Sequence, residues 1–392
     1  MVELLAKPIG GLYVHVPFCA RKCLYCAFYS EPSRGEVIDR YIGALIRELE
    51  RVAGDLRPRT IFIGGGTPSL LNLRQWEQVF RATERLPLSG VTEWTVECNP
   101  ATLSLDKARL LRSGGVNRVS LGVQSFDDTL LDRLGRVHSR QMAFHSFDLL
   151  RQAGFENVNL DLMFAIPGQT LAAWRQTLAE ATAMGSEHLS TYEVIYEEDT
   201  PLYEQLQAGK IEANEDLACA MYEELVQRVA SAGFQQYEVA NFARARNTNN
   251  QLPTNDYPSL ACRHNVNYWR GGSFYGLGPS ATTYVRGVRT KNHPNTQLYC
   301  EQLELSRRPL ESREELAPLA RAAETAAFGL RMAAGWPFEL FERVTGYDLR
   351  REWAEDMNQL VQQDRARILP DRFQLTREGL RFADAAAELF LR

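Results

Sequence analysis

Short runs of β-branched and other apolar residues alternate with longer amphipathic stretches over the first half of the chain. The apolar runs predict strands at residues 12–16, 60–63, 93–97, 118–122, 157–163 and 188–193. Between them, helical spacing of apolar positions predicts helices, for example at 37–52, 74–85, 141–153 and 171–184. Strand–helix repeats imply right-handed crossovers and a parallel sheet. Because six such units can be counted, we expect an α/β fold built on an open, partial (β/α)6 barrel rather than a closed eight-unit barrel.

The alternation fades after Glu193. Residues 199–206 and 214–232 predict two helices, and a short strand is expected at 233–238. The polar stretch 243–258, rich in asparagine and containing two prolines, predicts a loop or lid.

Helical patterns return near the C-terminus. They predict helices at 316–332, 337–344 and 349–363, a hairpin at 368–375 and a last helix at 376–391. This order is similar to a small, mostly helical, winged-helix-like α+β part. We therefore expect three parts: the barrel at 1–195, an extension at 196–310 and the C-terminal appendage at 311–392.

Composition narrows the class of protein. The chain has 392 residues and 45% hydrophobic content, enough for a large core. Its net charge is -5, with 44 Lys and Arg against 49 Asp and Glu, which gives no support to a nucleic-acid surface. Neither a membrane-spanning apolar run nor a signal-peptide core is apparent. Seven cysteines, three of them clustered, fit a reducing compartment, so we expect a cytoplasmic protein.

Cys19, Cys23 and Cys26 lie within eight residues, directly after the first predicted strand. Tetrahedral iron and zinc sites prefer four soft ligands, so three thiolates predict a distant fourth ligand or an open position. The spacing favours a 4Fe-4S cluster with one open iron. A structural zinc knuckle or three ordinary cysteines is the alternative, although zinc sites usually present two cysteine pairs. Tyr25 and Phe28 are expected to stiffen the loop and to exclude part of the water around it.

The spacing Cys-x3-Cys-x2-Cys after a strand resembles the signature of the radical S-adenosylmethionine (SAM) superfamily. The resemblance implies that the amino and carboxylate groups of SAM chelate the fourth iron. It further implies one-electron cleavage of the sulfonium to methionine and a 5'-deoxyadenosyl radical, with a reductant such as flavodoxin or ferredoxin as partner.

A glycine-rich segment follows the second predicted strand. Gly64, Gly65 and Gly66, with Thr67 after them, would let the backbone pass close to a ligand. A tight turn is the alternative. In parallel architectures ligands bind at the carboxyl ends of strands, where this segment falls. It resembles the superfamily's glycine motif, which implies that Gly65, Gly66 and Thr67 bind the amino group of SAM.

Four polar residues lie at or near the later strands: Glu97, Gln124, Arg136 and Asp161. Glu97 can accept hydrogen bonds from ribose hydroxyls or an ammonium. Arg136 suits bidentate pairing with a carboxylate. Asp161 lies within a buried strand, where an unpaired carboxylate is costly, so it requires a partner or a ligand. Each residue alone could be structural, but together they indicate a ligand site.

These residues are similar to those of the coproporphyrinogen III dehydrogenase branch of the superfamily. That resemblance implies that Arg136 binds the carboxylate of SAM and that Asp161 binds adenosyl hydroxyls. Tyr13, in the first predicted strand, matches an aromatic residue of the same branch. Phe28 stands where the dehydrogenase carries a fourth cysteine.

His264 belongs to a second motif, HNxxYW, that ends at Trp269. A histidine beside aromatic residues is often structural, but imidazole and indole together would also suit a flat tetrapyrrole with an axial ligand. The motif resembles the one that marks the HemW branch of haem chaperones, which implies haem as a ligand. One departure is the turn at 276–282, which lacks an expected histidine and resembles the dehydrogenase's turn near a second SAM.

We therefore expect a SAM- and cluster-binding haem chaperone that transfers haem to acceptor proteins. The alternative is a radical SAM enzyme, either an oxygen-independent coproporphyrinogen III oxidase or a methyltransferase that uses two SAM molecules. An iron–sulfur scaffold without enzymatic activity is a third possibility, but it would not need the glycine motif. No catalytic residue is assigned.

Overall fold

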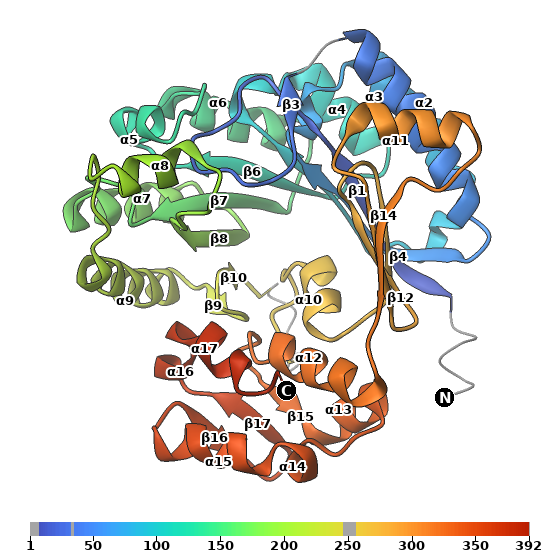
Figure 1. Cartoon of the computed structure of the whole chain (residues 1–392). Coiled ribbons are helices and arrows are strands. Elements are labelled where there is room, and N and C mark those ends of the chain that lie inside the picture. Colours follow the sequence, from blue (N-terminus) through green and yellow to red (C-terminus); the bar gives the residue numbers. More distant parts are fainter. Residues whose placement is uncertain (1–7, 33–34, 246–255, 392) are drawn as a thin grey trace.

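The computed structural model describes residues 8–32, 35–245 and 256–391. A curved 12-stranded sheet has the order β14-β13-β12-β11-β1-β4-β5-β6-β7-β8-β10-β9 (Figure 1). Most of the predicted loop at 243–258 lies outside the described residues. At the centre of the sheet, six strands run parallel in chain order, which confirms the predicted partial barrel.

All six predicted strands are present. They are β1 (Ile9–Val16), β4 (Leu56–Gly65), β5 (Glu93–Cys98), β6 (Arg118–Gln124), β7 (Val158–Phe164) and β8 (His188–Glu193). The helices that connect them are α2 (Gly35–Val52), α3 (Leu73–Thr83), α4 (Leu105–Ser113), α5 (Asp128–Arg133), α6 (Arg140–Gln152) and α7 (Leu171–Ala183). Helix starts follow local capping chemistry: the Asn72 side chain accepts from the Gln75 amide in a capping box.

The two faces of the parallel strands differ in polarity. Residues such as Leu12, Ile61 and Trp94 pack in the main core with the helices on the outer face. Alternating positions such as Glu93 and Arg118 are polar and buried on the concave face. Parallel strands covered on both faces are usually apolar throughout. The polar concave face therefore indicates that the barrel interior holds a hydrogen-bonded site.

The sheet extends beyond β1 by four strands that the sequence did not predict. These strands are β11 (Phe274–Leu277), β12 (Thr282–Val285), β13 (Val288–Asn292) and β14 (Leu310–Glu315). β11 is parallel to β1, and the others are antiparallel. The predicted turn at 276–282 therefore includes the ends of two strands.

At the other edge, the predicted strand 233–238 is confirmed only at β9 (Gln235–Gln236). β10 (Asn241–Ala243) lies between β9 and β8. The predicted helices are present as α8 (Pro201–Gln207) and α9 (Glu215–Ser231). Two further helices are α10 (Arg263–Trp269) and α11 (Thr296–Glu304). Figure 1 shows α10 on the concave side of the sheet, above the C-terminal part.

The C-terminal part is α+β, as expected. Its helices are α12 (Pro318–Gly329), α13 (Phe338–Thr345), α14 (Leu349–Glu352), α15 (Ala354–Gln362), α16 (Arg377–Arg381) and α17 (Ala383–Glu388). Its sheet has the order β15 (Trp336–Pro337), β17 (Arg372–Leu375) and β16 (Ala366–Ile368). These elements share a second hydrophobic core. The boundaries at 195 and 310 stay predictions, and the large sheet includes strands on both sides of residue 195.

Three helix predictions in this part need correction. The helix expected at 316–332 begins at Pro318, because β14 runs to Glu315 and proline is favoured at a helix start. The helices expected at 349–363 and 376–391 are each interrupted, at Trp353 and Phe382. The backbone at these two residues is not helical: φ is -123° at Trp353 and -114° at Phe382.

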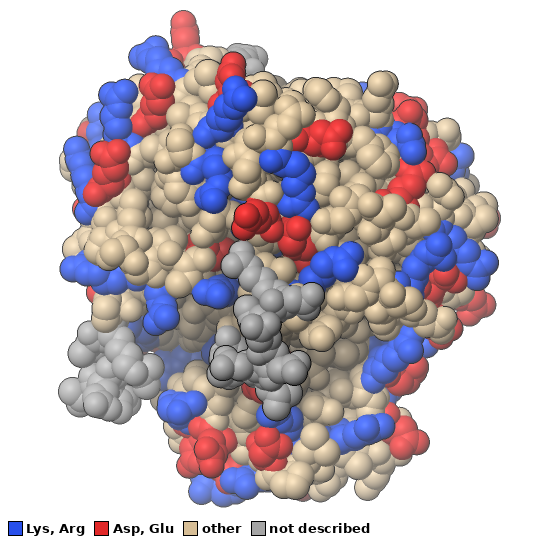
Figure 2. All heavy atoms as spheres, turned by 180° about the vertical axis from the view of Figure 1, so that it is seen from behind, with Lys and Arg blue, Asp and Glu red and all other residues tan. Residues whose placement is uncertain are grey.

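Charged side chains of both signs are interspersed on the face shown in Figure 2. None of the helices in the described ranges combines the length and apolar character needed to cross a bilayer.

Candidate functional site

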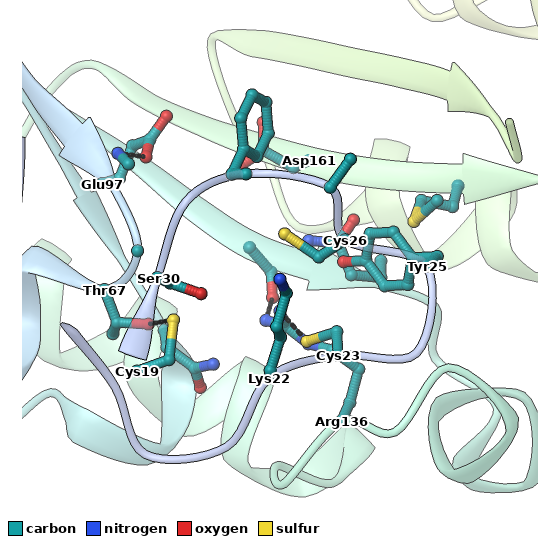
Figure 3. Close-up of a pocket in the computed structure, with 18 of the residues that line it drawn as sticks. Cys19, Lys22, Cys23, Tyr25, Cys26, Ser30, Thr67, Glu97, Arg136 and Asp161 are labelled. Atoms are coloured by element: carbon teal, nitrogen blue, oxygen red, sulfur yellow. Dashed lines mark hydrogen bonds between the residues drawn. The ribbon is translucent and has the colours of Figure 1, made fainter. Parts of the chain in front are cut away.

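A cavity of about 450 Å³ opens at the carboxyl ends of the parallel strands (Figure 3). Twelve of the fourteen residues predicted as site residues line it: Cys19, Cys23, Tyr25, Cys26, Phe28, Gly65, Gly66, Thr67, Glu97, Gln124, Arg136 and Asp161. The other two, Tyr13 and His264, do not. The strand ends thus bring together residues spread over more than a hundred positions, as expected for a parallel sheet.

The cysteine loop is held to the barrel at several points. The short strands β2 (Phe18–Cys19) and β3 (Glu31–Pro32) pair with each other at its two ends. In its middle, the Leu24 amide donates to the Leu134 carbonyl at 3.0 Å, and the Leu24 carbonyl accepts from the Leu202 amide at 2.9 Å. Tyr25 packs against a small apolar cluster that includes Leu134 and Leu202. Tyr25 therefore helps to fix the loop.

Phe28 behaves differently from Tyr25. Its side chain lies at the cavity rim and is 69% exposed. The expectation that Phe28 excludes water from the loop is therefore wrong for this structure. A side chain that is mostly exposed to solvent does not cover the cysteine residues.

The three thiols surround the cavity rather than converge on one point (Figure 3). Within the described ranges, no three His, Cys, Asp or Glu side chains are close enough together to hold a single metal ion. A zinc knuckle would require such convergence. In a cubane cluster each thiolate binds a different iron, so the sulfurs stand farther apart. The donor set and its spread around a cavity fit a 4Fe-4S cluster.

Two of the thiols receive hydrogen bonds from the cavity wall. The Thr67 hydroxyl donates to Cys19 Sγ at 3.6 Å, and Arg136 Nη1 donates to Cys23 Sγ at 3.5 Å. Donors of this kind stabilise thiolates and orient metal ligands.

The glycine segment passes directly beneath the cysteine loop. The Gly66 amide donates to the Val16 carbonyl at 2.7 Å. A Cβ on Gly66 would lie 2.7 Å from the Phe18 carbonyl oxygen, and Gly65 has a φ of +107°. Only glycine fits both positions without strain. The tight turn, one of the two alternatives that the sequence left open, is present, and the same segment lines the cavity, where a ligand would contact its backbone.

Glu97 and Asp161 place two half-buried carboxyl groups in the cavity. Glu97 accepts a hydrogen bond from the Gly65 amide at 3.0 Å. Burial, and secondarily the charge of Asp161, raise the pKa of Glu97 to about 8. Asp161 accepts from Asn159 Nδ2 at 2.7 Å and from the Ser120 hydroxyl at 3.2 Å, while burial raises its pKa to about 6. The partner expected for Asp161 is therefore present, and both carboxyl groups can accept further hydrogen bonds.

Arg136 and Gln124 have features that are typical of a ligand site. Arg136 Nη2 donates to the Gly122 carbonyl at 2.7 Å, but its Nε is shielded from solvent and has no partner among the described residues. A buried N–H without an acceptor is costly, and a carboxylate ligand would satisfy it. Gln124 ends β6 with a φ of +64°, which is uncommon for a side-chain-bearing residue and frequent at ligand sites.

Tyr13 lies inside the barrel, next to the cavity wall but not on it. Its hydroxyl donates to His15 Nδ1 at 2.9 Å. His15 Nε2 donates in turn to the Tyr29 carbonyl of the cysteine loop at 2.9 Å. Burial lowers the pKa of His15, which favours this neutral tautomer. In this structure Tyr13 supports the loop through His15 instead of lining the ligand cavity.

His264 lies near the opposite ends of the strands, in the first turn of α10, and is 1% exposed. Its Nδ1 bonds to the Thr60 hydroxyl at 2.9 Å and its Nε2 to the Tyr268 hydroxyl at 2.8 Å. Burial lowers its pKa to about 3, so the ring is neutral. The structural histidine is the alternative that this conformation supports, because haem iron could reach Nε2 only after Tyr268 moved.

Sequence reasoning missed Glu93, which anchors the HNxxYW motif. Its carboxylate accepts from the Arg263 amide at 2.7 Å, the His264 amide at 3.0 Å and the Cys262 thiol at 3.4 Å. Glu93 therefore caps α10 from the concave face of β5. The available signal was a glutamate as the first residue of a short predicted strand, a position that faces the same side of the sheet as Thr95 and Glu97.

Sequence reasoning also missed part of the cavity wall. The missed lining residues include Ser120, Met163, Tyr192, Glu193, Ile195 and Glu197. Most lie at or just after the end of β8, so the rule used for the earlier strands would have found them.

Comparisons with known proteins agree with this geometry. The family model of the radical SAM superfamily matches residues 13–181. A protein of Lactococcus lactis subsp. lactis described as heme chaperone HemW is 33% identical over 99% of this chain and 98% of its own length. The Escherichia coli K12 protein of the same description is 32% identical and covers 100% of both.

A vertebrate relative and a solved structure extend the comparison. Radical S-adenosyl methionine domain-containing protein 1, mitochondrial, of Danio rerio is 32% identical over 96% of this chain and 85% of its own length. The structure of coproporphyrinogen III oxidase (HemN) from Escherichia coli has a TM-score of 0.83, with 100% of this chain and 92% of that chain covered. At 20% identity, this similarity supports the fold alone.

Proposed function

The chain belongs to the radical SAM superfamily and, within it, to the HemW family, and from this premise we propose that it is a haem chaperone. Its membership implies a 4Fe-4S cluster and SAM. Haem is then the cargo, and haem-acceptor proteins and a small reductant are the partners.

One observation carries the proposal. Relatives described as heme chaperones match this chain from end to end at about one-third identity. The cavity supports it, since the cysteine loop, the glycine segment and the polar residues at or near the strand ends meet there.

We assign roles from the contacts on the cavity wall. Cys19, Cys23 and Cys26 would hold the cluster, whose chemistry is one-electron reduction of the SAM sulfonium. The unpartnered Arg136 Nε–H would bind the carboxylate of SAM.

The two carboxyl groups of the cavity wall would bind the rest of SAM. Glu97, beside the Gly65 amide, would accept from its ammonium, and Asp161 would accept from its ribose hydroxyls. Gln124 and the backbone at Gly66 and Thr67 would border the same ligand.

Haem retention tests the function. The protein is reconstituted anaerobically with iron and sulfide, mixed with excess haem and passed through gel filtration. We expect about one haem per chain to co-elute, and transfer to apomyoglobin to follow. Protein that holds its cluster but elutes without haem would contradict the proposal.

A second readout distinguishes a chaperone from an enzyme. With dithionite and SAM, an enzyme would release 5'-deoxyadenosine rapidly when coproporphyrinogen III is added. A chaperone should show only slow release that this compound does not change.

A further inference from the structure

Three large apolar side chains are exposed together at the rim of the cavity. Phe28 is 69% exposed, Ile195 is 65% exposed and Tyr192 is 43% exposed, and all three line the same cavity. Phe28 belongs to the cysteine loop, whereas Tyr192 and Ile195 belong to the end of β8 and the segment after it. Single exposed apolar residues are ordinary, but a group around one opening marks a binding surface.

The charges around the opening are arranged asymmetrically. Arg21 and Lys22, on the cysteine loop, line the cavity and make no ion pair or side-chain hydrogen bond with any described residue. Glu193 and Glu197 line it on the segment that carries Ile195. An anionic group would therefore bind toward the loop and away from the segment after β8.

Size limits what can bind at the rim. A cavity of about 450 Å³ lies toward the lower end of the usual range for ligand sites, roughly 300–1,000 Å³, and it must already accommodate a cluster and SAM. A macrocycle in addition could only cover the opening. Three apolar side chains are also far too few for a stable protein–protein interface, which involves roughly 20–30 residues on each side.

We propose that the haem cargo lies across this opening, with one face of the macrocycle against Phe28, Ile195 and Tyr192. Its propionates point toward Arg21 and Lys22. A planar, apolar ligand with two carboxylates matches both the apolar rim and the unpaired cations. This inference rests on the proposed function and places the cargo at the mouth of the barrel, away from His264.

The test compares haem affinities of variants by titration of the Soret absorbance. Phe28→Ser and Ile195→Ser each remove one apolar contact, and Leu305→Ser is the control, since Leu305 is 61% exposed but lies outside the cavity. We expect each rim variant to weaken haem binding roughly tenfold, with no change for the control. Iron and sulfide are measured in every sample. If Phe28→Ser loses its cluster, the result for Ile195→Ser still tests the proposal, because Ile195 is not part of the cysteine loop.

A charge variant tests the orientation. Arg21→Glu combined with Lys22→Glu should weaken haem binding further and reduce its dependence on salt. Wild-type affinity in both Ile195→Ser and the charge variant would overturn the inference. Loss of haem in His264→Ala, with the rim variants unaffected, would overturn it as well. If the wild-type protein binds no haem, the proposed function itself fails, which is a distinct result.

Discussion

The two ends of the barrel use similar residues in opposite ways. We call the cavity end, at the carboxyl ends of the parallel strands, the mouth, and the opposite end, next to α10, the floor. At the mouth, Glu97 and Asp161 have raised pKa values and Arg136 keeps a buried N–H without a partner. At the floor, near α10, Glu93 accepts three hydrogen bonds and both nitrogens of His264 are bonded. Polar groups at the mouth keep hydrogen-bonding capacity that a ligand could use, while those at the floor have partners within the chain.

This difference separates two kinds of sequence motif. The cysteine and glycine motifs lie where the strands end and leave donors and acceptors directed into a cavity. The HNxxYW motif is equally rich in polar and aromatic residues, but its histidine is occupied by Thr60 and Tyr268. Residue chemistry alone does not distinguish a binding motif from a structural one, because the distinction depends on which partners the fold supplies.

The largest effect is expected from the mouth. Cys23→Ser should abolish the cluster, since three thiolates are the minimum set for a cubane with one open iron. Iron content and the broad charge-transfer absorbance report the loss. Circular dichroism should be unchanged, because Leu24 and Tyr25 hold the loop independently of the metal. Cys219→Ser is the matched control, as Cys219 is a free thiol in α9 outside the cavity. Equal iron loss in Cys23→Ser and Cys219→Ser would show that the cavity thiol does not hold the cluster specifically.

A matched pair of substitutions compares the two ends directly. Glu93→Gln should lower the free energy of unfolding by about 2–3 kcal/mol, because buried donors of α10 lose a charged acceptor. Glu97→Gln should instead stabilise the apo protein by at least about 1 kcal/mol near pH 8.5. The folded-state pKa of Glu97, about 8, is above its ordinary value, so its contribution to stability is lost as the pH rises through about 8. Urea denaturation measures both changes.

The same two substitutions should differ in their effect on SAM affinity. Glu97→Gln should weaken SAM binding, whereas Glu93→Gln should leave it within a factor of about two. If Glu93→Gln weakened SAM binding as strongly as Glu97→Gln, the floor would be part of the binding site.

The mouth should also show a pH dependence that the floor does not. If Glu97 and Asp161 accept hydrogen bonds from SAM as proposed, SAM binding favours their ionised forms. The pKa values of these two groups without ligand are about 8 and about 6. Affinity should therefore rise by roughly tenfold between about pH 6 and pH 8, with release of protons on binding. Calorimetry in buffers of different ionisation enthalpy measures that release. An affinity that is flat over this range would show that neither carboxyl group faces the ligand.

The smallest effect is expected at the floor. Tyr268→Phe removes the hydroxyl that bonds to His264 Nε2 and should cost about 1 kcal/mol of stability. Haem and SAM affinities should stay at wild-type values. A gain in haem affinity would indicate that freeing His264 creates a ligand.

Much of the barrel and its mouth could be predicted from sequence. The apolar runs of buried parallel strands are distinctive, and the carboxyl ends of such strands must meet, so Glu97 and Asp161 could be grouped without coordinates. The floor could not be predicted, because the position of His264 depends on Thr60 and Glu93, both more than 150 residues away. β11 was missed since four residues provide too little pattern to identify a strand.

β1 carries the cysteine loop and lies between β4 and β11, with Leu12 paired to both Ile61 and Tyr275. One edge of β1 therefore has no hydrogen-bonding neighbour until synthesis has passed β11, well beyond the midpoint of the chain. This long sequence separation implies slow folding and a transiently exposed strand edge. Assembly of the cluster before β11 docks would occur on a half-formed support, so cluster insertion in the cell is expected to follow the synthesis and docking of β11.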